Sequence, residues 1–196
     1  KENPKRAEYP QIFKPVFEHA AQESGRPIGY FEEMATRIAP QFLTWALRSI
    51  DWGQYKLVGF TSTFDQNVAS LTMARLIKDL YPEVTIVFGG ANFDGEMGLE
   101  HFRAFPFIDH IVVGEGEDSF LPLVRQILAG KKSNYPNGVT YREGDKIMLT
   151  PNASLFSDFT KTGPPDYDDY YQLLSELGQT AQGLDRILLY EGSRGC

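Results

Sequence analysis

The sequence has little of what marks several large classes of protein. Among its 196 residues there is one cysteine, Cys196, so no internal disulfide framework can form and a reducing, cytoplasmic environment is predicted. No run of 18 or more apolar residues occurs, which predicts that the chain does not span a membrane. Nineteen basic residues face 26 acidic ones, and the net charge of −7 argues against a nucleic-acid partner, because phosphate binding needs clustered cations.

Two nucleotide-binding motifs are also missing. The chain has neither the GxGxxG spacing of a dinucleotide-binding fold nor a Walker-type lysine, so neither class of site is supported. What the chain does have is 42% hydrophobic and 23% charged residues. This balance is typical of a globular protein that buries a core of ordinary size.

The pattern of apolar residues predicts three parts. Residues 1–52 carry apolar side chains at helical spacing, broken into two helices by Gly25, Pro27 and Gly29, and we expect a helical segment that packs beside the next domain. Residues 53–152 form the central domain. Residues 153–196 are interpreted as a linker that ends in one more candidate strand, ILLY, directly before Cys196.

The central domain alternates short apolar runs with amphipathic stretches. The runs LVGFT (57–61), TIVFG (85–89) and HIVVG (110–114) are rich in β-branched residues, as are strands buried on both faces of a parallel sheet. Helical patterns follow at about 66–81, 95–105 and 117–130. This order predicts an α/β fold with a doubly wound, Rossmann-like or flavodoxin-like parallel sheet. A β-hairpin is predicted at 137–150, turning at residues 143–145.

Ligands of such sheets bind beyond the carboxyl ends of the strands, so the three loops there are the candidate site. Each has a purely structural alternative: Gly89 and Gly90 suit a tight turn, Asp65 could cap the next helix, and the two glutamates of GEGE would favour a helix dipole. Together the loops are expected to converge on one edge. The candidate cofactor-binding residues are Thr61, Ser62, Thr63, Phe64, Asp65, Gln66, Asn67, Gly89, Gly90, Ala91, Asn92, Gly114, Glu115, Gly116 and Glu117.

Three stretches carry a family resemblance: VGFTSTFDQNVASL, TIVFGGANFDGEMG and FIDHIVVGEGEDSFLPLV. Together they resemble the cobalamin-binding domain of radical S-adenosylmethionine enzymes. The sequences of these stretches most resemble those of the branch that matures ribosomal peptides and includes C-methyltransferases. The hairpin GVTYREGDKIML, the segment PPDYDDYY and the ending YEGSRGC continue the pattern, so the resemblance covers about residues 50–196.

The resemblance implies that cobalamin binds with its nucleotide tail inserted beside the sheet. The hydroxyls of 61–63 and the opening at 89–91 match the family's tail-binding surface, and 114–117 would line the nucleotide end. Phe64 and residues 65–67 would lie under the corrin ring. Classical carriers ligate cobalt through the His of a DxHxxG motif, and the matching stretch here has Asn67 in its place. We therefore expect base-off cobalamin without a His ligand, and interpret His19 and His101 as helix-surface residues.

The resemblance also implies a metal role for Cys196, as the first of three thiolates that hold a 4Fe-4S cluster for S-adenosylmethionine. One cysteine cannot hold a cluster, so the radical domain would be missing from this piece, which is expected to be inactive alone. The parent enzyme would methylate an unactivated carbon, in a peptide substrate. Two alternatives stay open. One is a non-catalytic module that binds or senses cobalamin or a flavin. The other is a radical enzyme with a vestigial cobalamin domain, catalysing methylthio transfer or rearrangement.

Overall fold

The computed structural model describes residues 8–178, and the chain divides into two compact units, residues 1–155 and 156–196. The second unit contains, within its described part, the 3₁₀ turn η5 (Phe159–Lys161) and helix α8 (Asp168–Leu177). The candidate strand ILLY and Cys196 lie outside the described residues. Over the described range, no helix is long and apolar enough to cross a membrane.

The first unit opens with helices, as predicted. They are α1 (Tyr9–Ile12), α2 (Lys14–Ser24), α3 (Ile28–Glu33), the π-helical turn η2 (Met34–Ile38) and α4 (Ala39–Ser49). Gly25 ends α2 with a φ of 68°, a left-handed conformation that glycine adopts without steric cost. The predicted break is confirmed at Gly25 and Pro27, but Gly29 lies inside α3.

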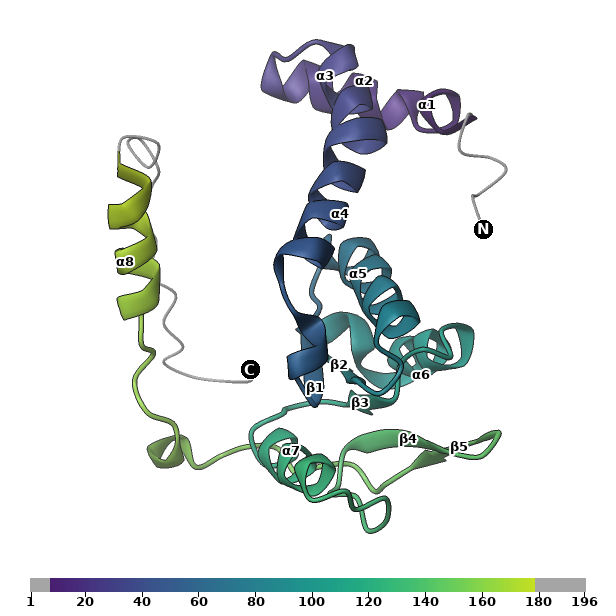
Figure 1. The fold of residues 1–196 in the computed structure, drawn as a ribbon, viewed down its shortest axis with the longest axis vertical. Coiled ribbons are helices and arrows are strands. Elements are labelled where there is room, and N and C mark those ends of the chain that lie inside the picture. Colours follow the sequence, from purple (N-terminus) through teal and green to yellow (C-terminus); the bar gives the residue numbers. More distant parts are fainter. Residues whose placement is uncertain (1–7, 179–196) are drawn as a thin grey trace. The chain divides into compact units, whose positions relative to one another are not determined.

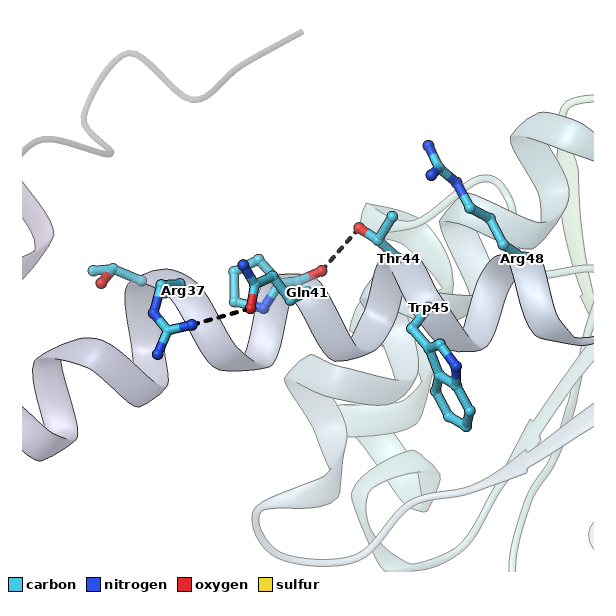
Figure 2. A pocket seen from close by; sticks show the side chains of 7 residues that line it. Arg37, Gln41, Thr44, Trp45 and Arg48 are labelled. Atoms are coloured by element: carbon cyan, nitrogen blue, oxygen red, sulfur yellow. Dashed lines mark hydrogen bonds between the residues drawn. The ribbon is translucent and has the colours of Figure 1, made fainter.

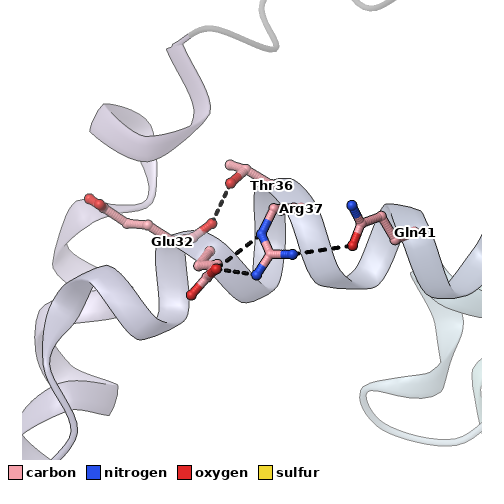
Figure 3. A network of polar contacts seen from close by, with 5 residues as sticks. Glu32, Thr36, Arg37 and Gln41 are labelled. Atoms are coloured by element: carbon pink, nitrogen blue, oxygen red, sulfur yellow. Dashed lines mark hydrogen bonds and ion pairs between the residues drawn. The ribbon is translucent and has the colours of Figure 1, made fainter.

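The π-helical turn has a cause in Pro40. A proline inside a helix lacks an N–H and clashes with the carbonyl four residues earlier, so the preceding turn widens. The Ala39 N–H accordingly donates to the Met34 carbonyl, five residues back. Side chains hold the widened turn, as Figure 3 shows: the Thr36 hydroxyl donates to the Glu32 carbonyl at 2.6 Å, and Arg37 donates to Gln41 at 3.3 Å. The chain thus continues from α3 into α4 without a loop.

The central domain is a five-stranded mixed sheet. Its strands are β1 (Leu57–Thr61), β2 (Thr85–Gly89), β3 (His110–Val112), β4 (Val139–Glu143) and β5 (Lys146–Leu149), in the order β1-β2-β3-β4-β5. The first three strands are parallel, and the hairpin β4–β5 adds to β3 in antiparallel fashion. Gly144 opens the two-residue turn with a φ of 60°, as in a type II′ hairpin. The predicted α/β fold is confirmed.

Helices cover both faces of this sheet (Figure 1). Helices α5 (Gln66–Leu80) and α6 (Gly95–Ala104) pack on one face, and α7 (Phe120–Leu128) packs on the other. Successive residues of β2 alternate between two cores. The first core includes Ile86, Phe88 and Ile111, and the second includes Val87, Val112 and Leu123. This burial on both sides explains why the parallel strands read as continuous apolar runs.

Candidate functional site

The loops that follow β1, β2 and β3 meet at one edge of the sheet. The Ser62 N–H donates to the Gly89 carbonyl at 2.9 Å, and the Asn92 N–H donates to the Ser62 carbonyl at 3.0 Å. The second and third loops are tied by Asp94, whose Oδ1 accepts the Gly114 N–H at 3.1 Å. These bonds confirm the predicted convergence, because each loop is hydrogen-bonded to its neighbour.

Ser62 and Gly90 are fixed by packing inside this edge. Ser62 is fully buried, and its hydroxyl accepts a hydrogen bond from the Asn92 side chain at 3.1 Å. Gly90 has a φ of +88°, and a Cβ there would lie 2.7 Å from the Ser62 carbonyl oxygen. The absence of a side chain at Gly90 therefore serves the close approach of two loops. Ser62 is therefore not accessible to a ligand. Its role is to hold together the loops that are accessible.

Phe64 is the most unusual residue of the edge. Its φ of 46° lies in the left-handed region, which is strained for a bulky side chain, and the residue is 91% exposed. The Asn92 side chain donates to the Phe64 carbonyl at 3.0 Å and holds the loop in this conformation. Two more exposed apolar side chains, Val68 and Met97, stand in the first turns of α5 and α6. Strain that presents an aromatic ring to solvent points to a binding role.

Asn67 contacts a histidine from another helix. Its Nδ2 lies 2.8 Å from His101 Nε2, and His101 Nδ1 lies 2.8 Å from the Met97 carbonyl oxygen. A carbonyl only accepts, so Nδ1 carries the proton and Nε2 accepts from the Asn67 amide. His101 is half-buried, and its ring contacts that of Phe93 in a tilted arrangement with ring centroids 4.9 Å apart. Its interpretation as a helix-surface residue was wrong, because sequence distance hid its place beside Asn67.

The start of α5 differs from the sequence-based expectation. Asp65 occupies the N-cap position but makes no capping hydrogen bond through its side chain. Gln66 supplies an acceptor instead: its Oε1 accepts from the Thr63 N–H at 3.0 Å and from the Thr63 hydroxyl at 3.2 Å. The structural alternative for Asp65, capping of the next helix, is therefore not observed, and its carboxylate is exposed at the edge.

The third loop is also longer than expected. Helix α7 begins at Phe120, not at 117, and its first turn holds no acidic residue. Glu115 and Glu117 therefore precede the helix, and the helix dipole does not account for them. Gly114 is exposed, with a φ of 74° and open space where a Cβ would stand. The Gly114 N–H is engaged by Asp94, but the space where a Cβ of Gly114 would stand is open to a ligand.

An apolar cavity lies beside the third loop. It measures about 250 Å³ and opens between α6, the end of β3 and the hairpin. Its apolar lining includes Leu99, Val113, Val139 and Leu149. A cavity of this kind at the carboxyl edge of a parallel sheet suits the uncharged part of a ligand.

A larger hollow of about 550 Å³ lies along η2 and α4. Arg37, Gln41, Thr44 and Arg48 follow one another along this continuous helix, and Figure 2 shows the ring of Trp45 on the side of the helix opposite to Thr44 and Arg48. All seven lining residues come from one helical stretch. The hollow contains none of the candidate cofactor residues. Within residues 8–178, no group of three His, Cys, Asp or Glu side chains is placed to hold a metal ion.

Comparison with known proteins shows partial, distant homology, and no family model matches the chain. The cobalamin-dependent radical SAM methyltransferase TokK of Streptomyces tokunonensis is 31% identical over 135 residues, which are 64% of this chain and 18% of TokK. An uncharacterized methyltransferase of Pyrococcus horikoshii, PH0819, is 31% identical over 114 residues, 57% of this chain and 24% of that protein. An anaerobic magnesium-protoporphyrin IX monomethyl ester cyclase of Rubrivivax gelatinosus is 29% identical over 112 residues, 55% of this chain and 20% of the cyclase.

The chain thus spans about a fifth of the length of these relatives. It is homologous, over part of its length, to radical SAM methyltransferases and cyclases. None of these names mentions a peptide.

Proposed function

We propose that this chain is the cobalamin-binding part of a radical S-adenosylmethionine methyltransferase. One observation carries the proposal: three strand-end loops are bound into a single edge that presents the strained, exposed ring of Phe64. A flat, largely apolar macrocycle is a suitable partner for such a ring. The partial homology to TokK supports the identity of the cofactor.

The residues of the edge fit such a cofactor in three places. Phe64, with the neighbouring Val68 and Met97, would face the corrin ring. The hydroxyls of Thr61 and Thr63 and the open backbone at Gly114 would contact the tail. The apolar cavity beside Gly114 would receive the base at its end. In this proposal Ser62 and Gly90 keep their structural role and do not touch the cofactor.

The lower face of cobalt would receive no imidazole from this loop. Asn67 stands where classical carriers have histidine, and the Nε2 lone pair of His101 is already engaged by the Asn67 amide. We therefore propose the base-off form without a His ligand. When bound, methylcobalamin would supply the methyl group for a carbon radical generated in the radical domain. The residues described above would orient the cofactor and shield one face from water.

The test is a visible absorption spectrum after incubation with hydroxocobalamin and desalting. The proposal expects near-stoichiometric retention with a base-off spectrum, and weaker retention of cobinamide, which lacks the nucleotide tail. A base-on spectrum would contradict the inserted tail, and absence of retained corrinoid would contradict the assignment for this chain. Phe64→Ala should retain less corrinoid than the unaltered chain. The control is Leu155→Ala, an exposed residue outside the three loops, which should retain as much as the unaltered chain.

A second candidate is supported by the cyclase among the relatives. A parent enzyme with a vestigial cobalamin domain could catalyse a radical reaction in which cobalamin donates no methyl group, as in methylthio transfer or rearrangement. The third candidate is a non-catalytic module that binds cobalamin or a flavin. Retention of flavin in place of corrinoid would favour it. The 4Fe-4S cluster, the role of Cys196 and the peptide substrate stay predictions. Transfer of the methyl group of labelled methylcobalamin to a carbon atom by the full parent protein would separate the first two candidates, because only the first takes its methyl group from cobalamin.

A further inference from the structure

A second cavity, here called the basal cavity, lies at the opposite end of the parallel strands. It measures about 270 Å³ and includes Thr85 and His110, the first residues of β2 and β3. The segment after α7 supplies Lys131, Lys132 and Tyr135, and β4 supplies Arg142. None of the candidate cofactor residues lines it. The basal cavity is therefore separate from the edge assigned to cobalamin.

The charge of the basal cavity is opposite in sign to that of the chain. The whole protein has a net charge of −7, yet three cationic side chains line this cavity, and its one acidic residue is Asp109. Asp109 is already paired: Lys78 Nζ lies 2.9 Å from its carboxylate, which also accepts the Ile86 N–H at 2.7 Å. The remaining cations leave a local excess of positive charge, which attracts an anion.

Two residues of the basal cavity also have buried polar atoms without partners. Buried polar groups are nearly always hydrogen-bonded, so each exception needs an explanation. Four buried side-chain atoms of the described residues lack a hydrogen-bond partner, and two of them are His110 Nδ1 and Arg142 Nε. His110 is only 8% exposed. Asp109, the one carboxylate of the lining, is already paired, so an acceptor from outside the protein would be the partner for these nitrogens.

We propose that the basal cavity binds the phosphate group of a small phosphoester. Lys131, Lys132 and Arg142 would compensate its charge, and His110 would donate from a ring nitrogen. The cavity approaches the roughly 300 Å³ at which small-ligand pockets begin, so it holds more than a bare phosphate. Ile127 and the ring of Tyr135 form an apolar wall for the organic part. This inference does not depend on cobalamin binding.

The experiment is calorimetric titration of the chain at constant ionic strength with three probes: inorganic phosphate, AMP and uncharged adenosine. We expect binding of phosphate, tighter binding of AMP, and no binding of adenosine. In the double variant Lys131→Gln/Lys132→Gln, AMP affinity should fall about tenfold or more, since two charge-assisted contacts are lost. Both lysines are exposed, so the variant should fold. Lys14→Gln/Lys56→Gln, two exposed lysines elsewhere, is the matched control and should leave AMP affinity unchanged.

A second variant tests the buried histidine. His110→Phe keeps the ring volume and removes the unpartnered nitrogen, so a merely structural histidine would give a chain of equal or higher stability with unchanged AMP affinity, which would overturn its role. The proposal expects lower AMP affinity with stability retained. Failure of both phosphate and AMP to bind, or equal affinity in the Lys131/Lys132 variant, would overturn the site. Phosphate binding without any gain for AMP would overturn the phosphoester as the ligand.

Discussion

The two ends of the same three parallel strands differ in chemistry. At the carboxyl end the loops are bonded to one another, contain no lysine or arginine between residues 61–67, 89–96 and 114–119, and present an aromatic ring. At the amino end cations surround a cavity with unpartnered buried nitrogens. One sheet can thus offer an apolar platform for a large flat ligand and a cationic cavity for a small anion.

The largest expected effect comes from Gly90→Ala at the carboxyl end. The new Cβ would stand 2.7 Å from the Ser62 carbonyl oxygen, at a φ of +88°, so the loops must separate. We expect a loss of about 2–4 kcal/mol in the free energy of unfolding, together with loss of corrinoid binding. Urea unfolding followed by circular dichroism measures the first effect.

The control for Gly90 is Gly95→Ala. Gly95 also has a positive φ, of +53°, but a Cβ there meets nothing within 4 Å, so only the backbone cost of about 1–2 kcal/mol applies. Equal losses in the two variants would show that the contact between Ser62 and Gly90 does not hold the edge together.

Phe64→Gly separates binding from folding at the same end. Glycine removes the strain at φ 46° but enlarges the conformational freedom of the unfolded chain, so stability should change by less than about 1 kcal/mol. Corrinoid affinity should fall about tenfold, because the exposed ring is lost. The measurement is titration with hydroxocobalamin. Asn134→Gly, at the other non-glycine residue with positive φ, 60°, is the control. Loss of affinity there too would point to a general effect of added flexibility.

Much of this architecture could be predicted from the sequence. The strand runs, the hairpin and the meeting of the three loops follow from burial on both faces and from the rule that parallel strands end at one edge. The boundaries were less predictable: β3 ends at Val112 and α7 begins at Phe120, because a GEGEDS segment suits a helix start as well as a loop.

The contacts that no sequence spacing reveals were missed. His101 is hydrogen-bonded to Asn67, 34 residues away in the sequence. Lys131, which follows α7, and His110, the first residue of β3, line the same cavity. Both depend on how helices cross the sheet, which one sequence does not specify. The one available signal was the pair Lys131-Lys132 after α7, a pattern that is equally typical of a solvated surface.

At the amino end, Asp109→Asn tests whether the acidic residue is balanced by its partners. The variant keeps an acceptor for the Ile86 N–H but loses the ion pair with Lys78, whose partners are largely shielded from water. We expect a loss of about 2 kcal/mol in the free energy of unfolding and tighter AMP binding, because a negative charge leaves the basal cavity. Asp79→Asn, in an exposed pair with Arg75, should change neither quantity noticeably. Weaker AMP binding by Asp109→Asn would contradict the proposed charge balance.

The smallest expected effect concerns pH. Burial lowers the pKa of His110 below its ordinary value of 6.5, against the opposing field of Asp109. The unfolded chain therefore takes up a proton at His110 before the folded chain does, and stability falls as pH drops below 6.5. Over the first pH unit below 6.5 this loss is at most about 1.4 kcal/mol. Urea unfolding at pH 7.5 and 5.5 should show a smaller loss for His110→Phe than for the unaltered chain, while His19→Gln, on an exposed helix position, should lose as much as the unaltered chain. If His110→Phe lost as much stability as the unaltered chain, protonation of His110 would not destabilise the folded state. His110 would then not be desolvated by the basal cavity.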